Sequence, residues 1–266
     1  GKGDETRAFV SCYMFNDIRA CDLKTYVPDE SPEKVTFIRH QPQAIEYIES
    51  LVEWGDSQEV TPIVCAYNLM FDMQTLMFSL NAEFDMETNA QSSTNVYTLD
   101  LMRDGVRVLR FWDTYHLEMR GLVAMGETCG IAKASGDWDY SLVRTPETEL
   151  TAEELFYAKR DVQVIPAYLR YLLEANEWMK PQDLGCRVLT KTSIVRQMAQ
   201  KQIGAKHFKN SHGHRISLLK SFESTCMQQM PKTYEQYALR KATFRGGFTF
   251  TAANTASIVV KNVASL

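Results

Sequence analysis

The longest amphipathic stretch of the chain runs from Thr151 to Tyr171, TAEELFYAKRDVQVIPAYLRY. Thr151 is followed three residues later by Glu154, a capping box that marks the start of a helix. Apolar residues then recur at helical spacing and predict a buried stripe, formed by Leu155, Val162, Ile165 and Leu169. We expect this helix to run to about Trp178.

The preceding pattern alternates between strands and helices. Residues 61–67 form a short apolar run that is typical of a buried central strand. An amphipathic helix is expected over 42–54, ended by Gly55, and another over 71–80. Further strand candidates are 7–15, 22–27 and 34–40. This alternation predicts an α/β domain with helices on the faces of its sheet.

Turn signals organise the middle of the chain. Asp104-Gly105 lies between two apolar runs and predicts a hairpin over 95–113. A helix over 117–128 is expected to close at Gly130, and 133–150 is expected to be a loop.

The pattern changes beyond Pro181, so we predict a domain over 1–180 and a mainly helical segment with a short β connector over 181–266. Expected helices are 190–201, 215–223 and 234–241, and expected strands are 244–250 and 257–263.

Composition narrows the function classes. The chain has 29 Lys and Arg against 33 Asp and Glu, so its net charge of −4 gives no global attraction to nucleic acid, and such binding needs a local groove. Six scattered cysteines without a CxxC motif favour thiols in a reducing compartment, and we expect a cytoplasmic location. No apolar run of about 18 residues predicts a membrane span, and no signal peptide is evident.

Two stretches carry candidate chemistry. Tyr157 and Asp161 are four apart and share one face of the expected long helix, although such pairs are also common on ordinary helix surfaces. In AYNLMFDMQTL (66–76), Asn68 ends the buried strand, while Phe71 and Asp72 open the next helix. Functional groups gather at the carboxyl ends of strands in open α/β sheets. The alternative is an Asp that favours the helix dipole beside a core Phe.

NLMFD and YAKRD together resemble the second and third motifs of the DEDD exonucleases. AYNLMFD, GDWDY (136–140), LTAEELFYAKRDVQVI and FRGGF (244–248) narrow the resemblance to protein-primed family B DNA polymerases of phages and linear plasmids. The motifs occur in the family's order over nearly the whole chain. The resemblance implies a ribonuclease-H-like exonuclease domain, a mixed sheet flanked by helices, joined to the start of a polymerase palm.

The resemblance also implies roles for individual residues. Asp72 and Asp161 would be carboxylate ligands of two Mg²⁺ or Mn²⁺ ions about 4 Å apart, which would lower the pKa of water and cover charge on the leaving oxygen. Tyr157 would orient the attacking water. Residues implied to contact the single-stranded primer terminus are Asn68, Phe71, Thr114, Tyr140, Phe244, Arg245, Gly246 and Gly247. The implied partners are DNA and the palm and thumb of the polymerase. A terminal protein primer could be another.

This chain departs from the family in its first motif, Asp-x-Glu, which supplies two of the four metal carboxylates. We expect that motif upstream of Gly1, so a fragment or split subunit with weak activity is expected. Asp85-Met86-Glu87 fits the pattern, but it follows the second motif in an expected loop. Phe244 replaces a usual tyrosine, Lys133 aligns poorly with a family lysine, and the catalytic motifs of the palm are absent.

Other readings remain open. A non-catalytic module with the same fold could grip single-stranded DNA or a partner, and a stand-alone DEDD nuclease could act on RNA. FRGGF argues against the latter, since such a nuclease has no need of a palm connector. His207, His212 and His214 lack the spacing of a zinc site, and we expect them to be solvated.

Overall fold

The computed structural model describes residues 12–92, 95–131, 144–204, 206–209 and 212–218, together with 220, 221, 224, 233–236 and 238. The chain divides into two compact units, 1–199 and 200–266. The boundary that the sequence predicts near residue 180 stays a prediction.

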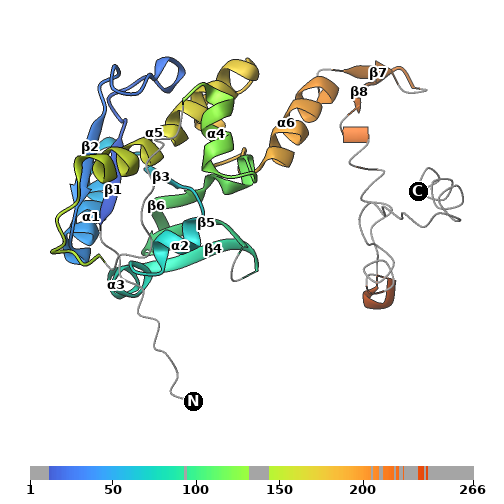
Figure 1. Cartoon of the computed structure of the whole chain (residues 1–266). Coiled ribbons are helices and arrows are strands. Elements are labelled where there is room, and N and C mark those ends of the chain that lie inside the picture. The colour runs from blue at the N-terminus through green and yellow to red at the C-terminus, as the bar shows by residue number, and fades with distance from the viewer. Residues whose placement is uncertain are drawn as a thin grey trace, which may run out of the picture. The chain divides into compact units, whose positions relative to one another are not determined.

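The first unit is built on a four-stranded mixed sheet with the order β3-β6-β5-β4 (Figure 1). β3 (Ile63–Ala66) pairs in parallel with β6 (Val106–Asp113). β6 pairs antiparallel with β5 (Asn95–Arg103), and β5 pairs antiparallel with β4 (Asp85–Ser92). A separate antiparallel ladder joins β1 (Tyr13–Asp17) to β2 (Lys34–Ile38). The predicted α/β class with a mixed sheet flanked by helices is confirmed.

Five α-helices of the first unit lie wholly within the described residues: α1 (Gln41–Gln58), α2 (Leu69–Met73), α3 (Met77–Glu83), α4 (Leu122–Cys129) and α5 (Ala152–Ala175). Short 3-10 turns lie at η1 (Leu23–Thr25), η2 (Thr114–Leu117) and η3 (Pro181–Asp183). α6 (Lys191–Gly204) ends in the second unit, where β7 (His207–Lys209) and β8 (Arg215–Ser217) form an antiparallel pair. Among the described residues, no helix combines the length and apolar character needed to span a bilayer.

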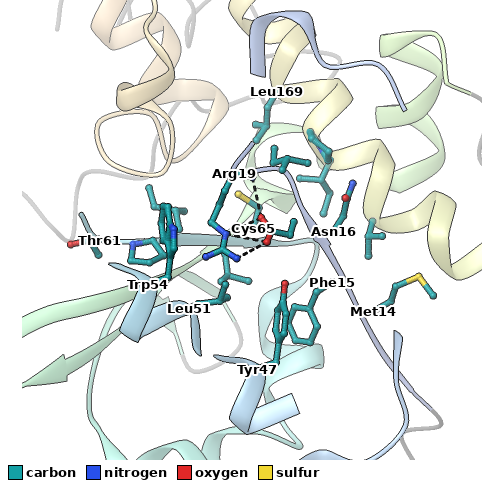
Figure 2. A pocket seen from close by; sticks show the side chains of 18 of the residues that line it. Met14, Phe15, Asn16, Arg19, Tyr47, Leu51, Trp54, Thr61, Cys65 and Leu169 are labelled. Carbon is teal, nitrogen blue, oxygen red and sulfur yellow. Dashed lines mark hydrogen bonds and ion pairs between the residues drawn. The ribbon is translucent and has the colours of Figure 1, made fainter. Parts of the chain in front are cut away.

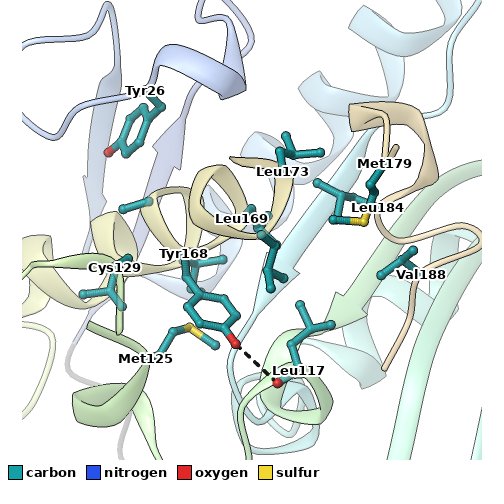
Figure 3. Close-up of a cluster of buried hydrophobic side chains, with 14 of the residues drawn as sticks. Tyr26, Leu117, Met125, Cys129, Tyr168, Leu169, Leu173, Met179, Leu184 and Val188 are labelled. Atoms are coloured by element: carbon teal, nitrogen blue, oxygen red, sulfur yellow. Dashed lines mark hydrogen bonds between the residues drawn. The ribbon is translucent and has the colours of Figure 1, made fainter. Parts of the chain in front are cut away.

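The sheet separates two apolar cores, because successive residues of a strand face opposite sides. In β6, Phe111 joins the core beneath α1, α2 and α3, whereas Trp112 joins the core beneath α4 and α5. Val64 and Cys65 of β3 divide between the two cores in the same way. In the second core, shown in Figure 3, the Tyr168 hydroxyl donates a hydrogen bond to the Leu117 carbonyl (3.4 Å).

The predicted start of α5 is confirmed by its cap. The Glu154 N–H donates to Thr151 Oγ1 (3.2 Å), and the Thr151 N–H donates to Glu154 Oε2 (2.9 Å). Arg144 adds an ion pair to the same carboxylate (2.5 Å). The helix ends at Ala175, three residues before the predicted end at Trp178.

Two glycine assignments had different outcomes. Gly130 ends α4 in the left-handed conformation, as predicted. Gly55 does not end its helix. α1 continues to Gln58, and Gly55 is buried where an added Cβ would lie 2.6 Å from Pro62 Cδ. The predicted hairpin is confirmed, with positive φ at both Asp104 (53°) and Gly105 (75°).

Several local predictions were wrong. The strand expected over 22–27 is replaced by η1, whose first turn is capped by the Asp22 side chain. The helix expected over 71–80 is divided into α2 and α3. The loop expected around Asp85 is β4, which is paired along its length with β5. The helix expected over 215–223 begins instead as β8.

Candidate functional site

The candidate site lies where two parallel strands end together. Ala66 at the end of β3 is the register partner of Asp113 at the end of β6. Because the two strands run in the same direction, the residues that follow them lie at one edge of the sheet. β3 leads into α2 and β6 leads into η2, so both connections begin at this edge.

Asp113 ties the two strand ends together. Its buried carboxylate accepts hydrogen bonds from the N–H groups of Asn68 (3.0 Å), Leu69 (3.1 Å) and Tyr115 (2.9 Å). Burial raises the pKa of Asp113, and the three N–H donors oppose that rise. Asp113 therefore has a structural role, because its hydrogen bonds hold the start of α2 against the end of β6.

The turn from β3 into α2 presents Phe71 and Asp72. Asn68 adopts the left-handed conformation (φ 66°, ψ 56°), which Asn tolerates better than most residues. This lets the chain enter α2 directly after the strand. Phe71 is 71% exposed, so the alternative of a core phenylalanine is wrong. Asp72 follows it within the first turn of α2.

The carboxyl group of Asp72 has an altered acidity. Desolvation among the surrounding protein atoms and, to a lesser degree, the nearby charge of Asp113 together raise the pKa of Asp72 to about 7. The residue itself is exposed, so water screens part of this effect. A cation bound beside Asp72 and Asp113 would reduce the repulsion between their negative charges.

Thr114 lies within the protein rather than on its surface. Its side chain is fully buried, and its hydroxyl donates to the Ala66 carbonyl (2.8 Å). It therefore joins the end of β3 to the start of η2. Its contact with DNA stays a prediction.

Tyr157 and Asp161 lie on α5, both partly buried and one helical turn apart. Their helical context is confirmed, whereas their roles stay predictions. Tyr140 and residues 244–247 lie outside the described residues, as do Lys133 and the expected strands over 244–250 and 257–263.

Carboxylate oxygens are the donors that Mg²⁺ prefers, so Asp72 and Asp161 fit such an ion in chemistry. Two carboxylates are too few ligands for such a site. Among the residues that the structure describes, no three His, Cys, Asp or Glu side chains gather into a possible metal site. Asp113, although it is close to Asp72, already accepts three backbone hydrogen bonds. His207, His212 and His214 are exposed, and they too belong to no such group of three possible metal ligands among the described residues.

The fold of this chain resembles that of Phi29 DNA polymerase. The structure of that enzyme with primer-template DNA and incoming nucleotides aligns with 82% of this chain at a TM-score of 0.55 and 15% identity. The complex of that enzyme with primer-template DNA aligns at a TM-score of 0.54 and 16% identity, and its complex with single-stranded DNA aligns at a TM-score of 0.51 and 15% identity. This chain spans about a third (34–35%) of the length of those polymerase chains. No protein-family model matches the chain, and no curated protein matches it.

The structural role of Asp113 was not predicted from the sequence. A signal was present, because Asp113 ends the apolar run VRVLRFW just as Asn68 follows the run TPIVCAY. Two polar residues that each end a buried strand predict a shared edge once the strands are known to be parallel. That parallel pairing is a long-range contact, which the local pattern does not specify.

Proposed function

We propose that this chain carries the 3′-5′ exonuclease region of a protein-primed DNA polymerase of family B and acts on single-stranded DNA ends. The observation that carries the proposal is the placement of Asp72 beside the exposed ring of Phe71, at the carboxyl ends of β3 and β6. The similarity of fold to Phi29 DNA polymerase and the order of the four sequence motifs support it.

Each named residue has a task in this proposal. Phe71 stacks on a base of the single strand, since an exposed aromatic ring binds any base through its π face. Asn68 contacts the same strand, and Tyr157 orients the attacking water. Asp72 and Asp161 would supply only part of the carboxylate set that holds Mg²⁺ or Mn²⁺, an ion that would acidify water and neutralise charge on the departing oxygen. The palm and thumb of the polymerase, and a terminal protein, are the proposed partners.

A second candidate is a non-catalytic module that grips single-stranded DNA. The observation that favours it is the absence of a third acidic side chain beside Asp72 and Asp113 among the described residues. Such a module would keep the stacking surface of Phe71 and would not cleave.

The deciding experiment follows a 5′-labelled single-stranded oligonucleotide with Mg²⁺ and this chain. Stepwise shortening from the 3′ end that Asp161→Ala and Asp72→Asn abolish supports the exonuclease. Asp85→Asn is the matched control, because Asp85 is an exposed aspartate at the start of β4. Retained DNA binding without shortening supports the module, and the loss of both binding and shortening contradicts both candidates.

A further inference from the structure

The connection between β1 and β2 is fastened to α5 by polar side chains. Lys159 Nζ donates to Asp29 Oδ1 (2.5 Å), and Gln163 Nε2 donates to the same oxygen (3.0 Å). Gln163 Nε2 also donates to Glu33 Oε1 (2.5 Å). Because Lys159 and Gln163 are one helical turn apart, both reach the connection from the same side of α5. These four side chains, Asp29, Glu33, Lys159 and Gln163, are called the α5 clamp below.

Glu33 anchors the clamp to the rest of the first unit. Its Oε2 accepts from the hydroxyl of Tyr26 (2.5 Å), which is fully buried, and from Asn16 Nδ2 (2.8 Å). Its Oε1 accepts from the Asp29 N–H (3.0 Å). Asn16 belongs to β1 and lines a cavity of about 370 Å³, which is shown in Figure 2. The Glu33 carboxylate therefore ties together β1, the connection and α5.

The part of α5 that the clamp holds has less apolar burial than the part that follows. Residues 152–162 are all exposed or half-buried, whereas residues 163–169 are all buried. Pro166 lies inside the helix and has no N–H to donate to the Val162 carbonyl, so the two parts share one fewer helical hydrogen bond. Polar contacts such as the clamp therefore contribute strongly to the placement of residues 152–162.

Tyr157 and Asp161 belong to this same part of α5. Successive residues of an α-helix are rotated by about 100°, so Lys159 and Gln163 lie on roughly the opposite side of the axis from Tyr157 and Asp161. The two pairs interleave within two turns. Any rotation of this part of α5 would move both pairs together, so a contact that fixes the clamp side also fixes the direction of Tyr157 and Asp161.

We propose that the α5 clamp positions Tyr157 and Asp161 for the reaction, with Asp29 and Glu33 as positioning residues that act through α5 and not by contact with DNA. This inference rests on the roles that the proposed function gives to Tyr157 and Asp161. A displacement of about 1 Å in a group that orients a reactant can cost about 100-fold in rate, so the clamp would act on the rate more than on DNA binding.

A pair of variants at Asp29 tests the clamp. Asp29 has a positive φ of 65°, a conformation that both asparagine and glycine adopt readily. Asp29→Gly removes the acceptor of Lys159 and Gln163, whereas Asp29→Asn keeps one oxygen for them and is the matched control. Replacement of Tyr157 by 3-fluorotyrosine provides a ¹⁹F NMR signal that reports the surroundings of its ring without DNA and without cleavage.

Asp29→Gly should shift or broaden the fluorine resonance at Tyr157, and Asp29→Asn should leave it as in the unchanged chain. A merely structural connection would lower the urea unfolding midpoint without moving the resonance of the folded chain. An unmoved resonance in folded Asp29→Gly would therefore overturn the proposal. A second label at Tyr171, beyond the buried residues 163–169, should stay unmoved. Equal changes at both labels would show a general loosening of α5 and would also overturn the proposal.

The oligonucleotide cleavage experiment gives the matching kinetic result. Asp29→Gly should lower kcat about 10- to 100-fold and change KM less than about threefold, and Asp29→Asn should recover most of the loss. An unchanged kcat in Asp29→Gly would overturn the positioning role. If the unchanged chain does not cleave, the proposed exonuclease fails, whereas the fluorine spectra still decide whether the clamp holds Tyr157.

Discussion

Asp113 and Asn68 are 45 residues apart in the chain, yet the Asn68 N–H donates a 3.0 Å hydrogen bond to the Asp113 carboxylate. The same carboxylate accepts from Leu69, which is fully buried. The end of one parallel strand therefore sets the conformation in which the next connection begins. Phe71 and Asp72 depend on that conformation, because they follow within the same helical turn.

Replacement of Asp113 should therefore destabilise the fold strongly. Asp113→Ala leaves the Leu69 N–H buried without its acceptor, and we expect a loss of about 2–4 kcal/mol in the free energy of unfolding. Asp113→Asn keeps one acceptor oxygen and should lose less. Urea unfolding followed by circular dichroism measures both losses. Asp85→Ala, at an exposed aspartate of β4, is the control and should stay within about 0.5 kcal/mol of the unchanged chain.

The acidity of Asp72 predicts a pH-dependent stability. The pKa of Asp72 is about 7 in the fold, above its ordinary value of 3.8, so between these values the folded state holds a proton that the unfolded state has released. Stability contributed by this group is thus lost as pH rises from about 4 to 7. Asp72→Asn should remove that loss, so the variant should be more stable than the unchanged chain at pH 8 and similar to it near pH 4.

The size of this effect is limited by solvent. Asp72 is exposed, so the free energy of unfolding should fall with pH by well under the ~1.4 kcal/mol per pH unit of a fully buried group. Urea midpoints at several pH values measure it, with Asp85→Asn as the control that should follow the unchanged chain. A constant difference between Asp72→Asn and the unchanged chain from pH 4 to pH 8 would contradict the prediction.

Features set by neighbouring residues could be predicted from the sequence. The capping box of Thr151 and Glu154, the turn at Asp104-Gly105 and the strand within 61–67 are of this kind, because their signals lie within a few residues. The prediction that this strand is central and buried was wrong, since β3 is partly exposed and stands at the end of the order β3-β6-β5-β4 among the described residues. The placement of Asn68 and Asp72 at the end of that strand followed from the same local pattern.

Features set by distant contacts could not be predicted in this way. β4 has mostly exposed polar residues and no alternating pattern, and it becomes a strand because β5 offers it a partner. Asp22 was assigned to a strand, although its side chain caps a 3-10 turn. Whether Asp161 approaches Asp72 depends on the packing of α5, which the helical pattern of α5 itself does not encode.

Gly55 offers a test of a packing contact that the helical pattern of residues 42–54 did not predict. Alanine normally stabilises a helix interior by about 0.5–1 kcal/mol relative to glycine. At this position an added Cβ would lie 2.6 Å from Pro62 Cδ and 2.7 Å from the Val60 carbonyl oxygen. Gly55→Ala should therefore destabilise the chain, by about 1–3 kcal/mol. Thermal unfolding measures the change, and an increase in the melting temperature would contradict the close packing of α1 on this segment.

A second exposed phenylalanine distinguishes base stacking on Phe71 from non-specific binding of DNA to exposed apolar surface. Phe78 of α3 is 90% exposed, against 71% for Phe71, so Phe78→Ala removes at least as much exposed apolar surface. Loss of one base–aromatic stack costs about 1–3 kcal/mol, so Phe71→Ala should weaken binding of a single-stranded oligonucleotide about 5- to 150-fold. Phe78→Ala should change binding less than about twofold. Fluorescence anisotropy in EDTA, at one fixed salt concentration, measures both affinities without cleavage of the DNA. Equal losses in the two variants would show that the oligonucleotide binds exposed apolar surface in general, and the edge formed by β3 and β6 would then no longer be the candidate DNA site.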